Sequence, residues 1–231
     1  MGSNQVQLLG AWPSPYVLRC RIALNIKSTN YQFLEETFGS KSDLLLKSNP
    51  VHKKIPVLIH AGRPICESLI IVEYIDQVWP SAPTLLPSDP YDRATARFWA
   101  AFVDQWYVSL KAVLMAEEEN DKKAAAVEET KRGLGVFEEA FVKCSKGGGF
   151  FGGERIGHVD IALGSLLSWI RVIEIKRKVS LIDESATPNL FHWALRFAAD
   201  DAVKSVFPDI HKHLQIADVV IAKFKPASHQ N

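Results

Sequence analysis

The chain has 231 residues, of which 47% are hydrophobic and 10% aromatic, enough to bury the core of one large domain or two small ones. Its 27 Lys and Arg residues balance 26 Asp and Glu, so no overall charge favours nucleic acid or an anionic membrane as a partner. No apolar run approaches the roughly 18 residues that cross a bilayer, and residues 1–10 lack the pattern of a secretory signal. We therefore expect a folded protein of the cytoplasm.

The three cysteines predict reduced thiols and no metal site. Cys20, Cys66 and Cys144 are widely spaced, without a CxxC pair and without a histidine that completes a metal-ligand pattern. His211 and His213 are two positions apart, which places them on different sides of a helix.

Strand-like and helix-like segments alternate over roughly the first 80 residues. The predicted elements are, in order, strand 6–9, helix 15–26, strand 31–33, helix 43–47, strands 55–60 and 65–67, and helix 68–79. A right-handed crossover returns the second strand parallel to the first, and the hairpin of the last two strands adds antiparallel pairing. The first and third strands then lie side by side, which is the arrangement of the thioredoxin-like fold.

A second domain follows a linker. Residues 84–93 hold two prolines and a Ser-Asp pair without periodicity, which predicts the linker. Apolar spacing beyond the linker predicts one long helix that begins near Pro90 and four further helices at 122–144, 156–174, 188–199 and 210–224. The chain is therefore divided into an α/β thioredoxin-like domain at 1–83, the linker, and an all-α domain at 94–231. A glycine-rich stretch at 146–154 lacks the phosphate-loop pattern and is interpreted as a turn.

The start of the helix at 156–174 has a capping pattern. Gly157 stands at the N-cap, Asp160 follows three residues later, and Ile156 and Ile161 form a hydrophobic staple. Asp160 is interpreted as a folding residue that accepts hydrogen bonds from first-turn amides. His158 is expected at the surface.

Ser14 lies between two prolines in the stretch AWPSPY. Serine at the N-cap followed by proline is a common helix opening, so capping alone explains it. The same serine is a candidate for chemistry if neighbouring segments build a ligand site around it.

Two segments suggest such a site. Glu67 and Ser68 open a helix whose free amides attract a carboxylate, and Glu67 accepts an ammonium, although plain capping by Ser68 explains the pair as well. A cis Pro56 would turn the backbone of Ile55 outward to pair with an extended peptide.

Two lysines complete the pattern. Lys41 and Lys54 lie on one side of the predicted sheet and suit a second carboxylate, or else they are solvated surface charges. The whole describes a receptor for a short peptide with an amino-acid head at one end and a carboxylate at the other. Glutathione has that shape.

Several motifs resemble those of plant tau-class glutathione transferases over nearly the whole chain: WPSPY, RIAL, NPVHKKIPVLIHAGRPICESLIIVEYI, LLPSDPYDRA, ARFW and the GxxD helix start. The resemblance implies a thioredoxin-like domain, an all-helical domain, glutathione as cosubstrate and a homodimer. It also implies roles for individual residues: Ser14 donates to the glutathione thiolate, Lys41 and Lys54 hold the glycine carboxylate, Ile55 before cis-Pro56 pairs with the cysteinyl unit, and Glu67 with Ser68 holds the γ-glutamyl unit.

The implied mechanism is nucleophilic attack by glutathione. Its thiol has a pKa of about 8.5, and a hydroxyl donor at a helix N-terminus lowers that pKa by about 2 units, or about 2.7 kcal/mol. The electrophile is expected between the domains. Candidates for this acceptor site are Trp12, Tyr16, Val108, Ala112 and Trp169, with ordinary core packing as the alternative for the aromatics.

Two positions depart from the class. Tyr16 stands where the class mostly has phenylalanine, and Val108 stands where a tyrosine is expected, which predicts a wider acceptor pocket.

Three functions are compared. The favoured one is conjugation of glutathione to apolar electrophiles, with reduction of organic hydroperoxides as a candidate side activity. A thiol oxidoreductase such as dehydroascorbate reductase is disfavoured, because related enzymes place cysteine where Ser14 stands and Cys20 lies inside the helix. Binding of flavonoid-like aromatic ligands needs the same apolar cleft and stays open.

Overall fold

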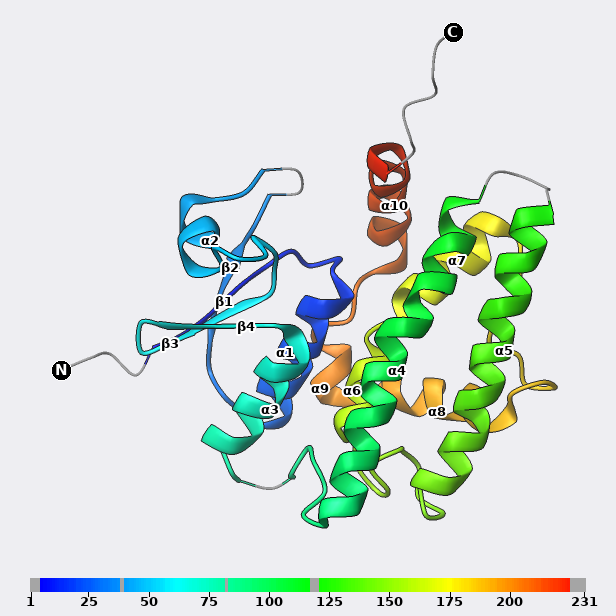
Figure 1. Cartoon of the computed structure of the whole chain (residues 1–231), viewed down its shortest axis with the longest axis horizontal. Helices are drawn as coiled ribbons and strands as arrows, with labels where there is room; N and C mark the ends of the chain where they lie inside the picture. The colour runs from blue at the N-terminus through cyan, green and yellow to red at the C-terminus, as the bar shows by residue number, and fades with distance from the viewer. Residues whose placement is uncertain (1–4, 38–39, 82, 117–120, 225–231) are drawn as a thin grey trace, which may run out of the picture.

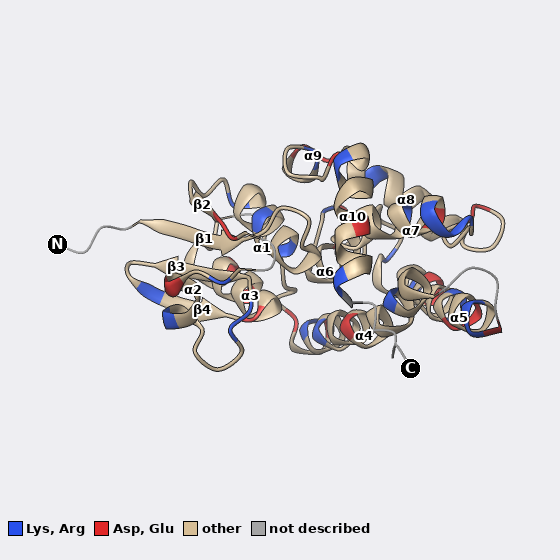
Figure 2. Cartoon of the chain, turned by 90° about the horizontal axis from the view of Figure 1, so that it is seen from above, with Lys and Arg blue, Asp and Glu red and all other residues tan. Residues whose placement is uncertain are grey.

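The computed structural model describes residues 5–37, 40–81, 83–116 and 121–224, and it divides into a sheet-containing part and a helical part (Figure 1). Charges of both signs occur on both parts (Figure 2). No helix in these described ranges has the length and apolar character needed to span a bilayer.

The N-terminal part is a mixed four-stranded sheet in the order β2-β1-β3-β4. The strands are β1 (Val6–Gly10), β2 (Gln32–Glu35), β3 (Val57–His60) and β4 (Arg63–Cys66). β1 pairs in parallel with β2 and antiparallel with β3, and β3 pairs antiparallel with β4. This confirms the thioredoxin-like arrangement and the adjacency of the first and third strands.

Helices cover both faces of the sheet. They are α1 (Pro15–Ile26), α2 (Asp43–Ser48) and α3 (Ser68–Val78). Successive strand residues point to opposite faces, so Leu8 joins the core formed with α1 and α3, whereas Leu9 packs with Leu45 of α2. Because the face of β1 that carries Leu8 packs against α1, the residues that precede the first turn of α1 lie at the carboxyl end of β1.

In the C-terminal part the regular elements of the described residues are helices, and α4 and α5 lie side by side (Figure 1). Its helices are α4 (Pro90–Met115), α5 (Asp121–Cys144), α6 (His158–Gly164), α7 (Leu167–Arg177), α8 (Pro188–Ala199), α9 (Asp201–Lys204) and α10 (Ile210–Phe224). Asp89 caps α4 by accepting hydrogen bonds from the amides of Tyr91 and Asp92, both at 2.9 Å. Residues 90–93 of the predicted linker are therefore helical.

The helix expected at 156–174 is two helices. The carbonyl of Ala162 accepts hydrogen bonds from the Ser165 hydroxyl at 2.9 Å and from Arg19 at 3.3 Å, while the amide of Leu166 donates to Leu163 instead. These bonds interrupt the regular i to i−4 ladder, so that α6 ends at Gly164 and α7 begins at Leu167. The short α9 was also not predicted; Asp200 caps it by accepting from the amide of Ala202 at 2.9 Å.

The start of α6 is confirmed as a folding element. Asp160 is fully buried, and its two carboxylate oxygens accept hydrogen bonds from four groups. These are the amides of Phe151, Gly152 and Gly157 and the indole of Trp193, at 2.7 to 2.9 Å. Burial raises the pKa of Asp160 to about 6, against the effect of these four donors.

The expectation that His158 lies at the surface is wrong. Its side chain is 2% exposed, and its amide donates to the carbonyl of Leu85 at 2.8 Å. His158 is buried because the segment before α4, which contains Leu85, covers the start of α6. Burial lowers the pKa of His158 to about 4.

Candidate active site at the start of α1

Ser14 caps α1, as predicted. Its hydroxyl oxygen accepts a hydrogen bond from the amide of Val17 at 3.4 Å, and its own amide donates to the carbonyl of Ala11 at 3.1 Å. The long bond to Val17 is weak, and it uses the serine oxygen as acceptor. The hydroxyl proton therefore remains available to a ligand beside the positive end of the helix.

A cavity of about 310 Å³ brings Ser14 together with three other predicted residues, Lys41, Lys54 and Ile55. Tyr16 lines the same cavity, as does Lys53, which the sequence analysis did not single out. The peptide bond between Ile55 and Pro56 is cis. A hydroxyl, a helix N-terminus, cationic side chains and the carboxylate of Glu36 thus surround one space large enough for part of a short peptide. The other predicted residues of the glutathione site, Pro56, Glu67 and Ser68, are not in its lining.

Glu67, and not Ser68, occupies the N-cap position of α3. Ser68 is the first residue of α3, and Glu67 is the N-cap, with a φ of 71° and no side-chain capping bond. The carboxylate of Glu67 is exposed and lies 3.8 Å from the imidazole of His52. The hydroxyl of buried Ser68 accepts a hydrogen bond from Arg19, so Ser68 connects the start of α3 to α1. The exposed carboxylate of Glu67 is the group of this pair that can reach a ligand.

Arg19 is the residue that sequence reasoning missed. It is fully buried on α1, and its guanidinium donates to Ser68 at 3.2 Å, to Ser165 at 3.3 Å and to the carboxylate of Asp104 at 2.7 Å. Asp104 lies on α4, so this side chain joins the start of α3 to the helical domain. The sequence did contain a signal for this role. Arg19 lies three positions before Ile22, on the same face of the helix, and a charged residue on a buried face usually has a partner.

Tyr16 and Tyr107 meet where the domains join. Their rings lie edge to face at 5.9 Å, and the guanidinium of Arg19 lies 4.9 Å from the centre of the Tyr16 ring. Burial raises the pKa of Tyr107 to about 12 and also raises the pKa of Tyr16. Tyr107, and not the predicted Val108 beside it in the chain, is therefore the residue of α4 that faces Tyr16.

The remaining acceptor-site candidates lie in two environments. Trp169 is buried, and its indole donates to the carbonyl of Pro13 at 2.8 Å, so it supports the loop that carries Ser14. Val108 is 69% exposed, and Ala112 lies one turn further along the exposed side of α4. Neither lines the 310 Å³ cavity, and their contact with an acceptor stays a prediction.

A ring cluster supports the same loop from α10. The imidazole of His213 lies 4.4 Å from Trp169 and 5.8 Å from Trp12, edge to face in both pairs. His213 is fully buried, and neither of its ring nitrogens has a hydrogen-bond partner among the residues that the structure describes. Burial lowers its pKa to about 4.

This burial predicts an acid-sensitive stability. The pKa of His213 rises to its ordinary 6.5 on unfolding, so the unfolded chain binds more protons between pH 4 and 6.5, and stability falls as pH decreases through that window. His158 acts in the same direction, whereas the raised pKa of Asp160 acts in the opposite one. His213→Phe should reduce the pH slope of the unfolding free energy by about 1.4 kcal/mol per pH unit, measured by urea denaturation.

The control for that measurement is His211→Phe, because His211 is exposed on the same helix. An unchanged slope in His213→Phe would show that its imidazole is not buried neutral.

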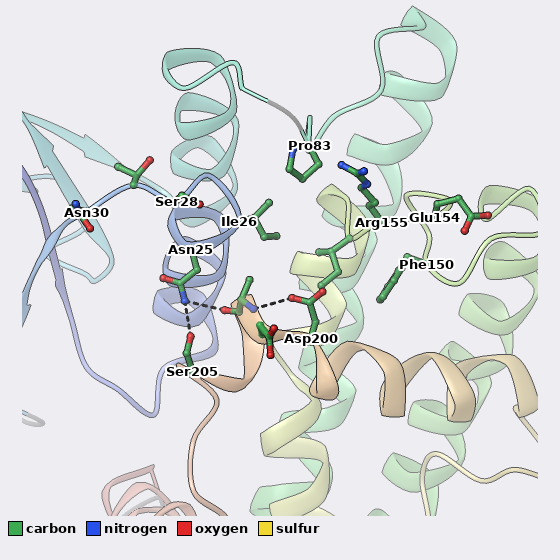
Figure 3. Close-up of a pocket in the computed structure, with 14 residues that line it drawn as sticks. Asn25, Ile26, Ser28, Asn30, Pro83, Phe150, Glu154, Arg155, Asp200 and Ser205 are labelled. Carbon is green, nitrogen blue, oxygen red and sulfur yellow. Dashed lines mark hydrogen bonds between the residues drawn. The ribbon is translucent and has the colours of Figure 1, made fainter.

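Other cavities lie outside this site. One of about 670 Å³ lies between the end of α1 and α9, where Asn25 donates to the carbonyl of Ala202 and the hydroxyl of Ser205 (Figure 3). Its lining includes none of the predicted site residues. A second, also about 670 Å³, is lined by Trp12 with residues of α10. No group of three His, Cys, Asp or Glu side chains able to hold a metal occurs in the part of the chain that the structure describes.

Comparison with known proteins identifies the family. The glutathione S-transferase N-terminal domain model matches residues 4–77, and the C-terminal domain model matches residues 102–201. Glutathione S-transferase U17 of Arabidopsis thaliana is 55% identical, with 96% of this chain and 99% of that protein covered.

Solved structures agree in fold. The tau-class glutathione S-transferase from mango (Mangifera indica) superposes with a TM-score of 0.90 at 58% identity, over 94% of this chain and 98% of that one. Rice GST1 in complex with glutathione superposes with a TM-score of 0.86 at 38% identity, over 96% of this chain and 98% of that one. The chain belongs to the glutathione S-transferase family, and within it to the tau class.

Proposed function

We propose that glutathione binds in the 310 Å³ cavity and that Ser14 stabilises its thiolate for attack on apolar electrophiles. The observation that carries this proposal is the meeting of Ser14, Lys41, Lys54 and Ile55 around one cavity at the N-terminus of α1. The similar rice protein was solved in complex with glutathione, which supports the choice of ligand.

In the proposed binding mode the tripeptide lies across the cavity. Lys41 and Lys54 hold the glycine carboxylate, and the backbone of Ile55 before Pro56 pairs with the cysteinyl unit. The γ-glutamyl unit extends beyond the cavity lining, where the exposed carboxylate of Glu67 accepts its ammonium. The α-carboxylate of that unit meets the first amides of α3, beginning with Ser68. The thiol then lies at Ser14.

Ser14 acts as a donor in this mechanism. Its hydroxyl proton and the helix end favour the thiolate, and the proton of the thiol leaves to solvent. The thiolate sulfur then forms a bond to the electrophilic carbon, and the leaving group departs with the electron pair of the bond that breaks.

The lysine roles predict a defined kinetic change. Lys54→Met should raise the KM for glutathione about tenfold, because one charge-assisted hydrogen bond contributes about 1.4 kcal/mol or more, and kcat should change little. Steady-state conjugation of an activated aryl halide, with glutathione varied, measures both constants. Lys47→Met is the control, since Lys47 is exposed on α2 outside the cavity. A lower kcat at unchanged KM would contradict the assignment.

Two further activities are proposed. In hydroperoxide reduction, the thiolate attacks the outer oxygen, the alcohol leaves, and a second glutathione reduces the sulfenic acid to yield the disulfide and water. For flavonoid-like aromatic ligands we propose the separate cavity beside Trp12, in place of the acceptor cleft expected from the sequence, because Phe207 adds an aromatic wall there and Lys212 adds positive charge for phenolate groups.

We also propose a homodimer of the cytoplasm. Apolar side chains are exposed at positions that a second copy would cover: Val51 at 81%, Ile70 at 59%, Tyr91 at 79% and Phe98 at 60%. Three free cysteines agree with a reducing compartment. Analytical ultracentrifugation tests the dimer, and a single species with the mass of one chain would contradict it.

A further inference from the structure

Glu36 brings a carboxylate into the lining of the active-site cavity, which is proposed to receive the glycine carboxylate of glutathione. The residue directly follows β2, is half-buried and lines the cavity with Ser14 and Lys41. Two like charges at close range repel each other, so Glu36 does not suit a direct contact with that group. Its bonds within the protein indicate a different role.

The carboxylate of Glu36 is held by Ser42. One oxygen accepts a hydrogen bond from the Ser42 amide at 3.1 Å, and the other accepts from the Ser42 hydroxyl at 2.5 Å. The same hydroxyl oxygen accepts from the amide of Leu45 at 3.0 Å and so caps α2. Within the described ranges no ion pair joins this carboxylate to a lysine, so the lysines of the cavity keep their charge for a ligand.

The backbone of Glu36 joins the same segment to the cavity wall that carries Ser14. Its amide donates to the carbonyl of Gly10, the last residue of β1, at 2.8 Å. Ala11 follows Gly10 and lines the cavity, and its carbonyl accepts from the amide of Ser14 at 3.1 Å. Glu36 therefore connects the segment before α1 with the segment before α2.

Lys41 depends on this connection for its position. It stands directly before Ser42 and is exposed, so core packing does not hold it. Nearby, the amide of Ser40 donates to the carbonyl of Thr37 at 3.1 Å, and both residues line the cavity. A flexible cationic side chain binds a carboxylate more tightly when its backbone is already fixed, because less conformational entropy is lost on binding.

We propose that Glu36 is a positioning residue for glutathione: by holding Ser42 at the end of β1, it places Lys41 at the cavity for the glycine carboxylate. This inference rests on the proposed function, in which Lys41 binds that carboxylate. Glu36 itself contacts no reacting atom, and its effect is on the affinity for glutathione alone.

Glu36→Ala tests the proposal in steady-state conjugation of an activated aryl halide with glutathione varied. We expect the KM for glutathione to rise about threefold to tenfold, the effect of leaving one long side chain to be ordered on binding. The kcat, the KM for the aryl halide and the acid limb of the pH profile should stay unchanged, because Ser14 and the thiol are not affected. Glu35→Ala is the matched control, since Glu35 carries the same charge one position earlier, is exposed and lies outside the cavity lining.

The sign of the change separates positioning from simple repulsion. If Glu36 acted only as a like charge on the glycine carboxylate, its removal would lower the KM for glutathione. Glu36→Gln loses the charge but keeps one acceptor oxygen for Ser42, so its KM should lie between those of wild type and Glu36→Ala. A KM below the wild-type value in either variant would overturn the proposal.

A double-mutant cycle shows whether Glu36 acts through Lys41. Added to Lys41→Met, Glu36→Ala should raise the KM for glutathione by less than about twofold, whereas added to Lys54→Met it should raise it by its full factor. A general loosening of the domain would not depend on Lys41. A full further increase in the Lys41→Met background would therefore contradict the positioning role.

The outcomes keep this inference apart from the proposed function. A raised KM in Lys41→Met together with a wild-type KM in Glu36→Ala would overturn the role of Glu36 and leave the glutathione site intact. A wild-type chain that does not conjugate glutathione would refute the proposed function itself. Thermal denaturation establishes that the variants are folded, and Glu36→Gln carries the test if Glu36→Ala is not.

Discussion

Replacement of Asp160 by alanine is expected to lower the free energy of unfolding by about 3–5 kcal/mol. The side chain is fully buried and accepts from three amides and the indole of Trp193. Alanine removes all the acceptors at once and leaves the four donors without partners. Since Trp193 lies on α8 and Phe151 precedes α6, the loss spreads across the helical domain.

Urea denaturation followed by tryptophan fluorescence measures this loss. Asp160→Asn is the graded control, because its single amide oxygen can satisfy at most two of the four donors and its NH₂ group opposes the others. We expect it to lose roughly half as much stability as alanine. A loss below about 1 kcal/mol for Asp160→Ala would show that water or rearrangement replaces the carboxylate.

The importance of Asp160 was predictable because its signal is local. The spacing of Gly157 and Asp160 within one helical turn is sufficient to indicate a cap. The same holds for Ser14 before Pro15, and for the alternation that places the strands of the sheet. Most of the fold could thus be predicted from patterns within single helices and strands.

Features that depend on distant partners were not predictable in this way. The break between α6 and α7 arises because Arg19, more than 140 positions earlier, takes a carbonyl that the helix would otherwise use. His158 is buried because the segment around Leu85 lies over it. In each case the deciding contact comes from a segment distant in the chain and outside the helical domain, and no periodicity within one segment describes it.

The candidate site shows the same division. Ser14, Lys41, Lys54 and Ile55 were predicted to share one ligand, and the structure places them around one cavity. The contacts behind them were not foreseen: Ser68 is held by Arg19, and Tyr107 rather than Val108 faces Tyr16. Residues that contact a ligand can be predicted from the chemistry of that ligand. The residues that position them can be identified only from the packing of the folded chain.

Replacement of Ser14 by alanine is expected to lower kcat/KM for an activated aryl halide about 10²-fold to 10³-fold, the magnitude of removing one preorganised donor to a developing or bound anion. The cap bond to Val17 is only 3.4 Å long, so the accompanying loss of stability should stay near 1 kcal/mol. The variant therefore remains folded, and its activity reports the chemistry. Thermal denaturation alongside the kinetics establishes this.

The pH profile distinguishes a donor from a structural serine. Without the hydroxyl, the pKa of bound glutathione should rise toward its value of about 8.5 in water, and the acid limb of kcat/KM should shift upward by one unit or more. Ser14→Thr keeps a hydroxyl and a cap, so it should restore part of the shift. Flavonoid binding beside Trp12, measured by fluorescence quenching, should be unchanged in Ser14→Ala, because that cavity does not include Ser14. Turnover equal to wild type in Ser14→Ala would refute the donor role, since α1 would then stabilise the thiolate by its helix end alone.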